Sequence, residues 1–118
     1  MFSMCYVTAP SLEVGKRIAR LLVTQRRAAC VNLLPAVTSI YSWEGQLEES
    51  EEVLMLIKTQ TACVSDVITA VREHHPYDCP EVVSVVLGEG SDPYLAWVAA
   101  QTDKRPPLPS TSAEHTSN

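Results

Sequence analysis

The ten residues from Arg72 to Glu81, REHHPYDCPE, carry two of the chain's three histidines, one cysteine and three carboxylates. Neutral imidazole is a ligand for copper, zinc and nickel, and a thiolate suits Cu(I). Neighbouring residues on a regular helix point about 100° apart, so His74 and His75 can share one ion only where a helix ends. Pro76 ends a helix here, because the residue before proline is pushed out of the helical region. The stretch therefore predicts either a metal site or a helix stop whose imidazoles cap free carbonyls.

Cysteines are the other soft ligands of the chain: Cys5, Cys30, Cys63 and Cys79. No two of them form a C-x-x-C pair, which argues against a zinc knuckle or a thioredoxin-type redox site. The opening MFSMCYVTAP lacks the features of a secretory signal, so we expect free thiols in the reducing cytoplasm. Cys79 could complete a Cys-His set, or it is only a small, semi-apolar residue in a connector.

Two further groups of side chains could form ligand sites. One is a run of glutamates: Glu48, Glu49, Glu51 and Glu52. No loop with EF-hand spacing surrounds them, so we interpret them as the solvated flank of a hairpin that protects an edge from wrong pairing. The other group lies near predicted strand ends: Tyr41, Trp43, Lys58, Tyr77 and Glu81. These residues either line a cleft between subunits that binds a small anionic ligand, or pack in an interface with their polar tips satisfied.

Composition and motifs argue against several function classes. The sequence has no glycine-rich phosphate loop, dinucleotide fingerprint or identifiable oxyanion hole, and only four glycines, so we expect no enzyme. A net charge of -5 with scattered Lys and Arg argues against nucleic acid as a partner, since phosphate contact needs a basic face. No apolar run is long enough to cross a bilayer, so we expect no membrane partner.

Hydrophobic spacing predicts the elements that must position these residues. Ser3–Thr8 is short, apolar and typical of a buried strand. Ser11 is a candidate N-cap for a helix that reaches about Gln25, with apolar residues at helical spacing. An extended region follows over Ala28–Trp43, and Pro35 predicts a bend, bulge or edge position within it.

The second half of the chain repeats the alternation of strand and helix. Glu44-Gly45 predicts a turn, after which Glu51–Lys58 pairs back as a strand and completes a long hairpin. Thr61–His75 has the apolar stripe of a helix. Glu81–Leu87 is a near-continuous β-branched run, typical of a strand covered on both faces. Pro93–Thr102 predicts a short final helix.

The order β-α-β-β-α-β with a terminal helix predicts an α+β domain over residues 1–102, in the split β-α-β arrangement with both long helices on one face of the sheet. Residues 103–118 are polar and proline-rich, so we expect a disordered tail. Two helices shield only one side of the sheet, although the hairpin strands are apolar. We therefore expect another copy of the chain or a partner to bury the open side, and a homo-oligomer is the simplest solution.

Six blocks of sequence, in this order, carry a resemblance to a known family: Thr8-Ala9-Pro10, Ala28–Asn32, Ser39–Gly45, Ile57-Lys58-Thr59, His75-Pro76-Tyr77 with Pro80-Glu81, and Tyr94–Trp97. Together they resemble the CutA family of divalent-cation tolerance proteins over most of the chain. The resemblance implies a ferredoxin-like subunit in a tight homotrimer, in which neighbouring sheets meet edge to edge as in the PII proteins. It brings no established catalytic reaction.

The resemblance also implies copper binding and a role in tolerance to divalent cations. The copper ligands proposed in bacterial relatives are a His-His pair before Pro-Tyr, which matches His74 and His75, and a cysteine directly before Thr-Ala-Pro, where this chain has Val7. Cys5 lies two residues earlier on the same strand face and is a candidate for a displaced ligand. Animal relatives have been linked to anchoring or processing of acetylcholinesterase. The alternative is thus a PII-like trimer that binds a small ligand or a protein partner.

Overall fold

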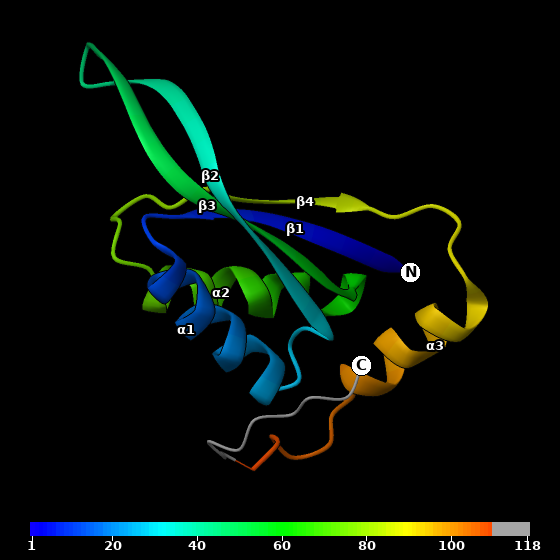
Figure 1. The fold of residues 1–118 in the computed structure, drawn as a ribbon. Coiled ribbons are helices and arrows are strands. Elements are labelled where there is room, and N and C mark those ends of the chain that lie inside the picture. The colour runs from blue at the N-terminus through cyan, green and yellow to red at the C-terminus, as the bar shows by residue number, and fades with distance from the viewer. Residues whose placement is uncertain (110–118) are drawn as a thin grey trace.

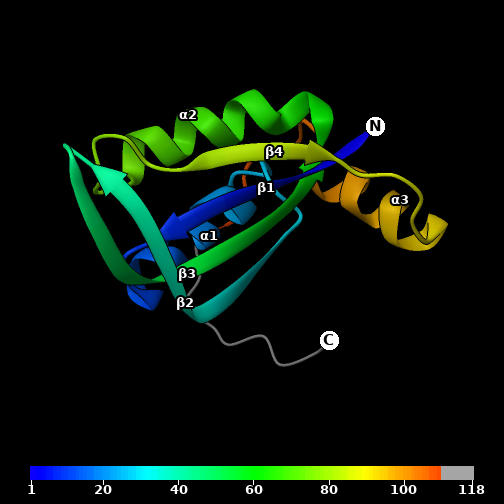
Figure 2. The ribbon, with the colours of Figure 1, turned by 90° about the horizontal axis from the view of Figure 1, so that it is seen from above.

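The computed structural model describes residues 1–109, which form one four-stranded antiparallel sheet with two long helices on one of its faces (Figure 1). The strands follow the order β2-β3-β1-β4, as Figure 2 shows from above. The elements along the chain are β1 (Phe2–Ala9), α1 (Leu12–Thr24), β2 (Cys30–Trp43), β3 (Gln46–Gln60), a single 3-10 turn η1 (Thr61–Cys63), α2 (Val64–His74), β4 (Val82–Val86) and α3 (Asp92–Gln101). This order confirms the predicted α+β, split β-α-β arrangement.

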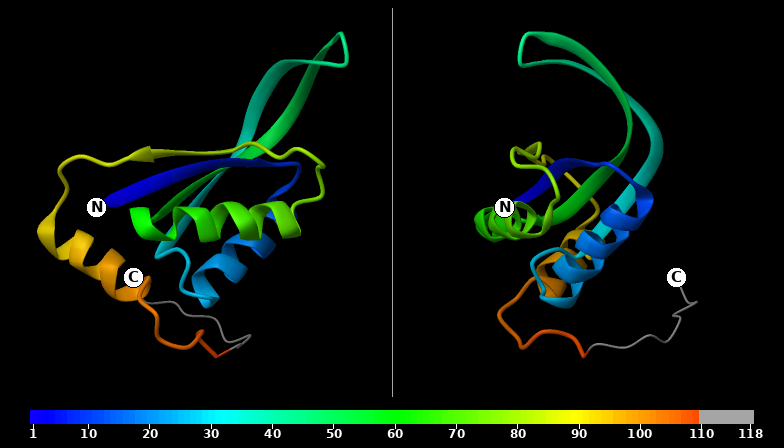
Figure 3. Two further views of the ribbon diagram at one scale, coloured as in Figure 1. Left: turned by 180° about the vertical axis from the view of Figure 1, so that it is seen from behind. Right: turned by 90° about the vertical axis from the view of Figure 1, so that its left-hand side faces the viewer.

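The core lies between the sheet and the two long helices. Strand β1 runs through the middle of the sheet between β3 and β4, and its alternate residues Cys5, Val7 and Ala9 are buried in the core. The remaining members of the buried cluster come from β3, the two helices and the connector before β2: Met55, Ile57, Ile18, Ala19, Leu22, Ala28, Val67, Ala70 and Val71. Within residues 1–109, no helix lies over the other face of β1 and β3 (Figure 3).

Local side-chain and proline chemistry sets the start of α1 and the end of α2. The Ser11 hydroxyl accepts a hydrogen bond of 3.2 Å from the Val14 N–H, which confirms Ser11 as the N-cap of α1. Helix α2 ends at His74, one residue before the predicted end. Pro76 forces His75 into extended backbone with φ of -85° and ψ of 140°, so the two adjacent histidines leave the helix in different directions.

Strands β2 and β3 form a long hairpin that projects beyond the rest of the sheet and curls away from it (Figure 1 and Figure 3). Its two-residue turn has Glu44 and Gly45 at φ of 51° and 79°, the left-handed pair that a type I′ turn requires. A bulge at Pro35 and Ala36, the latter with φ of 65°, confirms the predicted interruption of β2.

Strand β3 begins at Gln46 rather than at the predicted Glu51, because backbone pairing with β2 continues through the glutamates of the hairpin. Glu48, Glu49 and Glu51 are exposed, as expected for a solvated flank. Glu52 is buried, so that interpretation is wrong for this one glutamate. Its carboxylate has a hydrogen-bond partner from the connector between α2 and β4.

Strand β4 pairs only with β1 and forms one edge of the sheet. The prediction of a strand covered on both faces is therefore wrong for the single chain: Val83 and Val85 are 54% and 45% exposed. An edge strand has a sheet neighbour on one side only, and no other element of the described chain covers the face that carries these two valines. The apolar sequence of β4 thus has no matching cover within the described residues.

Helix α3 packs at the end of the sheet away from the hairpin tip (Figure 1). The Gln60 side-chain amide donates to the Thr102 hydroxyl at 2.9 Å, which ties the end of α3 to the end of β3. Residues 103–109 then run back towards the end of α1, where the Leu108 N–H donates to the Thr24 carbonyl at 2.7 Å. The expectation of a disordered tail falls partly on residues 110–118, outside the described part. No described helix is long and apolar enough to span a membrane.

Candidate functional site

His75 is a buried link between β1 and the connector that follows α2. Its side chain is 7% exposed. The backbone N–H of Tyr77 donates to Nδ1 of His75 at 3.1 Å, so Nδ1 carries no proton and the ring proton is on Nε2. Nε2 then donates to the Thr8 carbonyl, 2.7 Å away at the end of β1. Both ring nitrogens are therefore occupied by protein partners.

His74 lies in a different environment, although it is the neighbouring residue. Its side chain is exposed at the end of α2, and its carbonyl accepts a hydrogen bond of 3.3 Å from the Arg17 guanidinium of α1. The two imidazoles thus do not face one common point. Within residues 1–109, no three His, Cys, Asp or Glu side chains come together in an arrangement that would hold a metal ion.

Cys5 is not brought to the histidines. It is fully buried in the core, and burial raises the pKa of its thiol to about 11. A metal needs the thiolate, so this position is unfavourable for a ligand in the single chain. All four cysteines are free, as predicted. Only Cys79 is exposed, whereas Cys30 and Cys63 are half-buried.

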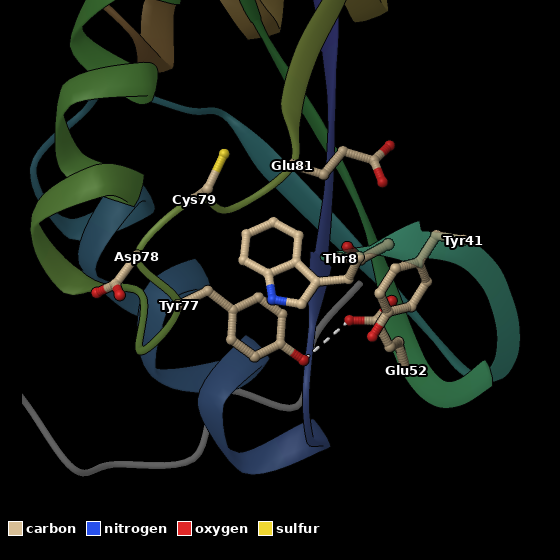
Figure 4. A pocket seen from close by; sticks show the side chains of 8 residues that line it. Thr8, Tyr41, Glu52, Tyr77, Asp78, Cys79 and Glu81 are labelled. Carbon is tan, nitrogen blue, oxygen red and sulfur yellow. Dashed lines mark hydrogen bonds between the residues drawn. The ribbon is translucent and has the colours of Figure 1, made fainter. Parts of the chain in front are cut away.

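A pocket of about 380 Å³ lies next to His75, between the hairpin and the connector from α2 to β4 (Figure 4). Its lining residues come from β1, β2, β3 and the connector: Thr8, Tyr41, Trp43, Glu52, Tyr77, Asp78, Cys79 and Glu81. Four of the five residues predicted for a ligand cleft, Tyr41, Trp43, Tyr77 and Glu81, are among them. The curl of the hairpin brings residues far apart in the sequence to one place.

Lys58 does not line this pocket. It lies six residues from Glu52 along β3, a separation of about 20 Å at the rise of an extended strand. Its ammonium group donates to the Asn32 side-chain carbonyl on β2. The lining therefore holds three carboxylates, from Glu52, Asp78 and Glu81, and no Lys or Arg. This charge favours a cation over the anionic ligand that the sequence suggested.

Tyr77 connects the pocket to His75. Its hydroxyl donates to Oε2 of Glu52 at 3.0 Å, the contact drawn as a dashed line in Figure 4. Its ring also lies against the His75 ring, with centroids 4.7 Å apart. Partial burial, then the hydrogen bond to Glu52 and the charge of that carboxylate, raise the pKa of Tyr77 to about 12. A continuous series of contacts thus runs from β1 through His75 and Tyr77 to β3.

Four residues that line the pocket are not among those predicted for the cleft from the sequence: Thr8, Glu52, Asp78 and Cys79. Glu52 was grouped with the exposed glutamates because nothing in its neighbours reveals the tyrosine that approaches it. Asp78 and Cys79 follow Pro76-Tyr77 directly, so the same connector signal could have included them. In Figure 4 the carboxylates of Asp78 and Glu81 lie on opposite sides of the pocket, which explains why these acids form no metal cluster.

Comparison with known proteins adds the family. Residues 3–101 match the family model described as CutA1 divalent ion tolerance protein. Human Protein CutA is 48% identical over 101 residues, covering 86% of this chain and 56% of that protein. The divalent-cation tolerance protein CutA of Thermus thermophilus is 42% identical over 102 residues, covering 86% of this chain and 99% of that protein. The chain spans little more than half the length of the mammalian relatives.

Solved structures agree with these sequence matches. The divalent cation tolerance protein of Thermus thermophilus superposes with a TM-score of 0.85 at 42% identity, covering 87% of this chain and 100% of that one. CutA1 from Oryza sativa gives a TM-score of 0.85 at 36% identity, covering 88% of this chain and 95% of the rice chain. Fold, ordered sequence blocks and family model coincide over most of the chain. The protein belongs to the CutA1 divalent ion tolerance protein family.

Proposed function

We propose that the protein works as a cytoplasmic homotrimer in the response to divalent metal ions, and that it binds copper weakly without catalysing a reaction. The relative from Thermus thermophilus is named a divalent-cation tolerance protein, which supports the role in metal tolerance. Four free cysteines support the reducing cytoplasm for this chain. Relatives described as chloroplastic and periplasmic indicate that the compartment varies within the family.

The observation that carries the oligomer is the apolar surface that the single chain leaves open. It lies on the hairpin and on β4, and seven of its large members are Leu34, Ile40, Trp43, Leu47, Val83, Val85 and Val86. Fully burying one such side chain contributes about 1.5–3 kcal/mol, so covering seven that are roughly half exposed supplies on the order of 5–10 kcal/mol per subunit. That gain is comparable with the cost of association, about 4–15 kcal/mol.

A ring of subunits follows from the two different edges of the sheet. The hairpin forms one edge and β4 forms the other. A two-fold dimer joined through one edge leaves the second edge unpaired on both chains, whereas head-to-tail contacts use both edges and form a ring when the rotation between neighbouring subunits closes. The number three comes from the family resemblance.

Copper would bind at the exposed end of α2. His74 offers an accessible imidazole, while His75 offers a nitrogen only if its ring gives up the bond to Thr8 or to Tyr77. Two ligands of this kind, completed by water or by a neighbouring subunit, give weak and exchangeable binding rather than a closed site. Cys5 would need to leave the core to take part.

Native mass spectrometry with and without Cu(II) tests both parts of the proposal together. We expect a trimer mass in both samples and additional copper ions only in the second. Replacing His74 and His75 by Ala should weaken Cu(II) binding in calorimetry at least tenfold while the trimer persists. Copper binding unchanged by both substitutions would remove the site, and a monomer mass would remove the oligomer.

The pocket supports a second candidate, a PII-like trimer that binds a small ligand or a protein partner, for example as a scaffold in acetylcholinesterase maturation. Its aromatic and acidic lining suits a positively charged group. Glu52→Gln removes the buried charge and keeps an acceptor for the Tyr77 hydroxyl. Under this candidate the substitution weakens binding of a cationic ligand and leaves Cu(II) binding at His74 unchanged.

A further inference from the structure

The segment after α3 contains a proline motif that the metal-tolerance role does not use. Residues 105–109 read Arg-Pro-Pro-Leu-Pro, with Lys104 directly before them. The segment has no helix or strand, and residues 104–109 are exposed. Three of the chain's eight prolines lie within these five positions. This concentration is typical of the polyproline II ligands that peptide-binding domains recognise.

Proline chemistry restricts the backbone of this segment before any partner binds. Each proline fixes its own φ near -65°. Each residue before a proline is pushed towards extended or polyproline II backbone, which applies to Arg105, Pro106 and Leu108. Every residue of the segment is therefore a proline or precedes one, so little conformational entropy remains to be lost on binding.

The spacing divides the segment into distinct edges. In a polyproline II helix, which has three residues per turn, Pro106 and Pro109 would fall on one edge and Arg105 and Leu108 on another. The domain holds the second edge: Arg105 donates to the Ala100 carbonyl at 2.6 Å, and the Leu108 N–H donates to the Thr24 carbonyl. The Pro106 and Pro109 edge carries exposed rings.

We propose that Pro106–Pro109 is a docking motif for a protein domain whose aromatic-lined groove reads polyproline II helices, of the SH3 or WW kind. Such grooves take prolines spaced as P-x-x-P between aromatic rings, which matches Pro106 and Pro109. The exposed Lys104, which precedes the motif, fits a groove with acidic residues at one end, whereas Arg105 is ion-paired with Asp103 at 2.8 Å. The role is independent of metal binding and of the trimer.

The domain's own contacts compete with this docking. The Arg26 Nε–H donates to the Pro106 carbonyl at 2.9 Å, so one carbonyl of the motif is already bonded. Arg26 has φ of 59°, a backbone conformation that glycine adopts without strain. Arg26→Gly therefore removes the restraining side chain without a backbone penalty, and it should strengthen docking about threefold or more.

Calorimetric titration of the whole chain with purified SH3 domains and purified WW domains tests the proposal, and the responding set identifies the kind of groove. The expected result is sub-millimolar binding by at least one set, weakened at least tenfold in the double variant Pro106→Ala/Pro109→Ala. Pro107→Ala is the matched control, because Pro107 lies on a third edge, and it should change affinity by less than about threefold.

Binding by neither set would overturn the proposal, as would binding that the double variant leaves unchanged. Equal losses of affinity in the double variant and in Pro107→Ala would also overturn the proposal, because recognition would then not depend on the edge that carries Pro106 and Pro109. The proline variants should keep the circular dichroism spectrum and oligomer mass of the parent chain, since the substituted residues are exposed.

Discussion

Replacing His75 by Ala should destabilise the protein, whereas replacing its neighbour His74 should not. The His75 ring makes two hydrogen bonds, to the Thr8 carbonyl and from the Tyr77 N–H. Each contributes about 1 kcal/mol, and leaving the buried Thr8 carbonyl without a partner costs about 1 kcal/mol more. We therefore expect His75→Ala to lower the free energy of unfolding by about 3 kcal/mol. Because His74 is exposed, His74→Ala should change the free energy of unfolding by less than about 0.5 kcal/mol.

Urea unfolding followed by circular dichroism measures this difference, at one fixed protein concentration because unfolding of an oligomer depends on concentration. His75→Gln provides an intermediate variant, since a side-chain amide can still donate to one partner or accept from the other. The midpoint should fall in the order parent, His74→Ala, His75→Gln, His75→Ala. Equal midpoints for the two alanine variants would refute the structural role that we assign to His75, and would favour two equivalent surface ligands.

Three further results are expected. The folded-state pKa of Tyr77, about 12, lies above its ordinary value of 10.0, because folding favours the neutral phenol. The contribution of the neutral phenol to stability is therefore present below pH 10 and is lost as the pH rises towards 12. Ultraviolet titration should reveal a late phenolate in the parent that Tyr77→Phe lacks, and the absence of this difference would contradict the Glu52 contact. With a thiol reagent at pH 8, the exposed Cys79 should react first, and Cys5 should react only on unfolding. Cys79→Ser should remove the early phase of the reaction, whereas rapid reaction of Cys5 would contradict its burial. The double variant Val83→Glu/Val85→Glu should dissociate the oligomer in size-exclusion chromatography, whereas the control Thr69→Glu, on the exposed side of α2, should not. An unchanged oligomer in the double variant would place the interface elsewhere.

Elements and their order were predictable because local signals determine them. Ser11 as an N-cap, Pro76 as a helix stop and Glu44-Gly45 as a hairpin turn each act within a few residues, and the structure confirms all three. The start of β3 was missed because pairing with β2 depends on the partner strand, and the glutamates around Glu51 have weak strand preference of their own.

The site was only partly predictable, because its geometry depends on contacts distant in sequence. A period of two places Cys5 on the same face as Val7, but it does not say that this face is the buried one. The curl of the hairpin brings Tyr41 over the connector and leaves Lys58 far along the same strand pair, and no local pattern encodes such a curl. The apolar composition of β4 predicts a strand buried on both faces, whereas in the single chain β4 is an edge strand with exposed valines.

The central claim is that sister chains cover the open apolar side of the sheet. Sedimentation equilibrium of the purified protein at micromolar concentration tests it most directly. One chain has a mass of 13.0 kDa, and we expect a single species at three times that value. A stable species at 13.0 kDa under these conditions would contradict the account, because the exposed valines of β4 and the apolar hairpin would then have no partner.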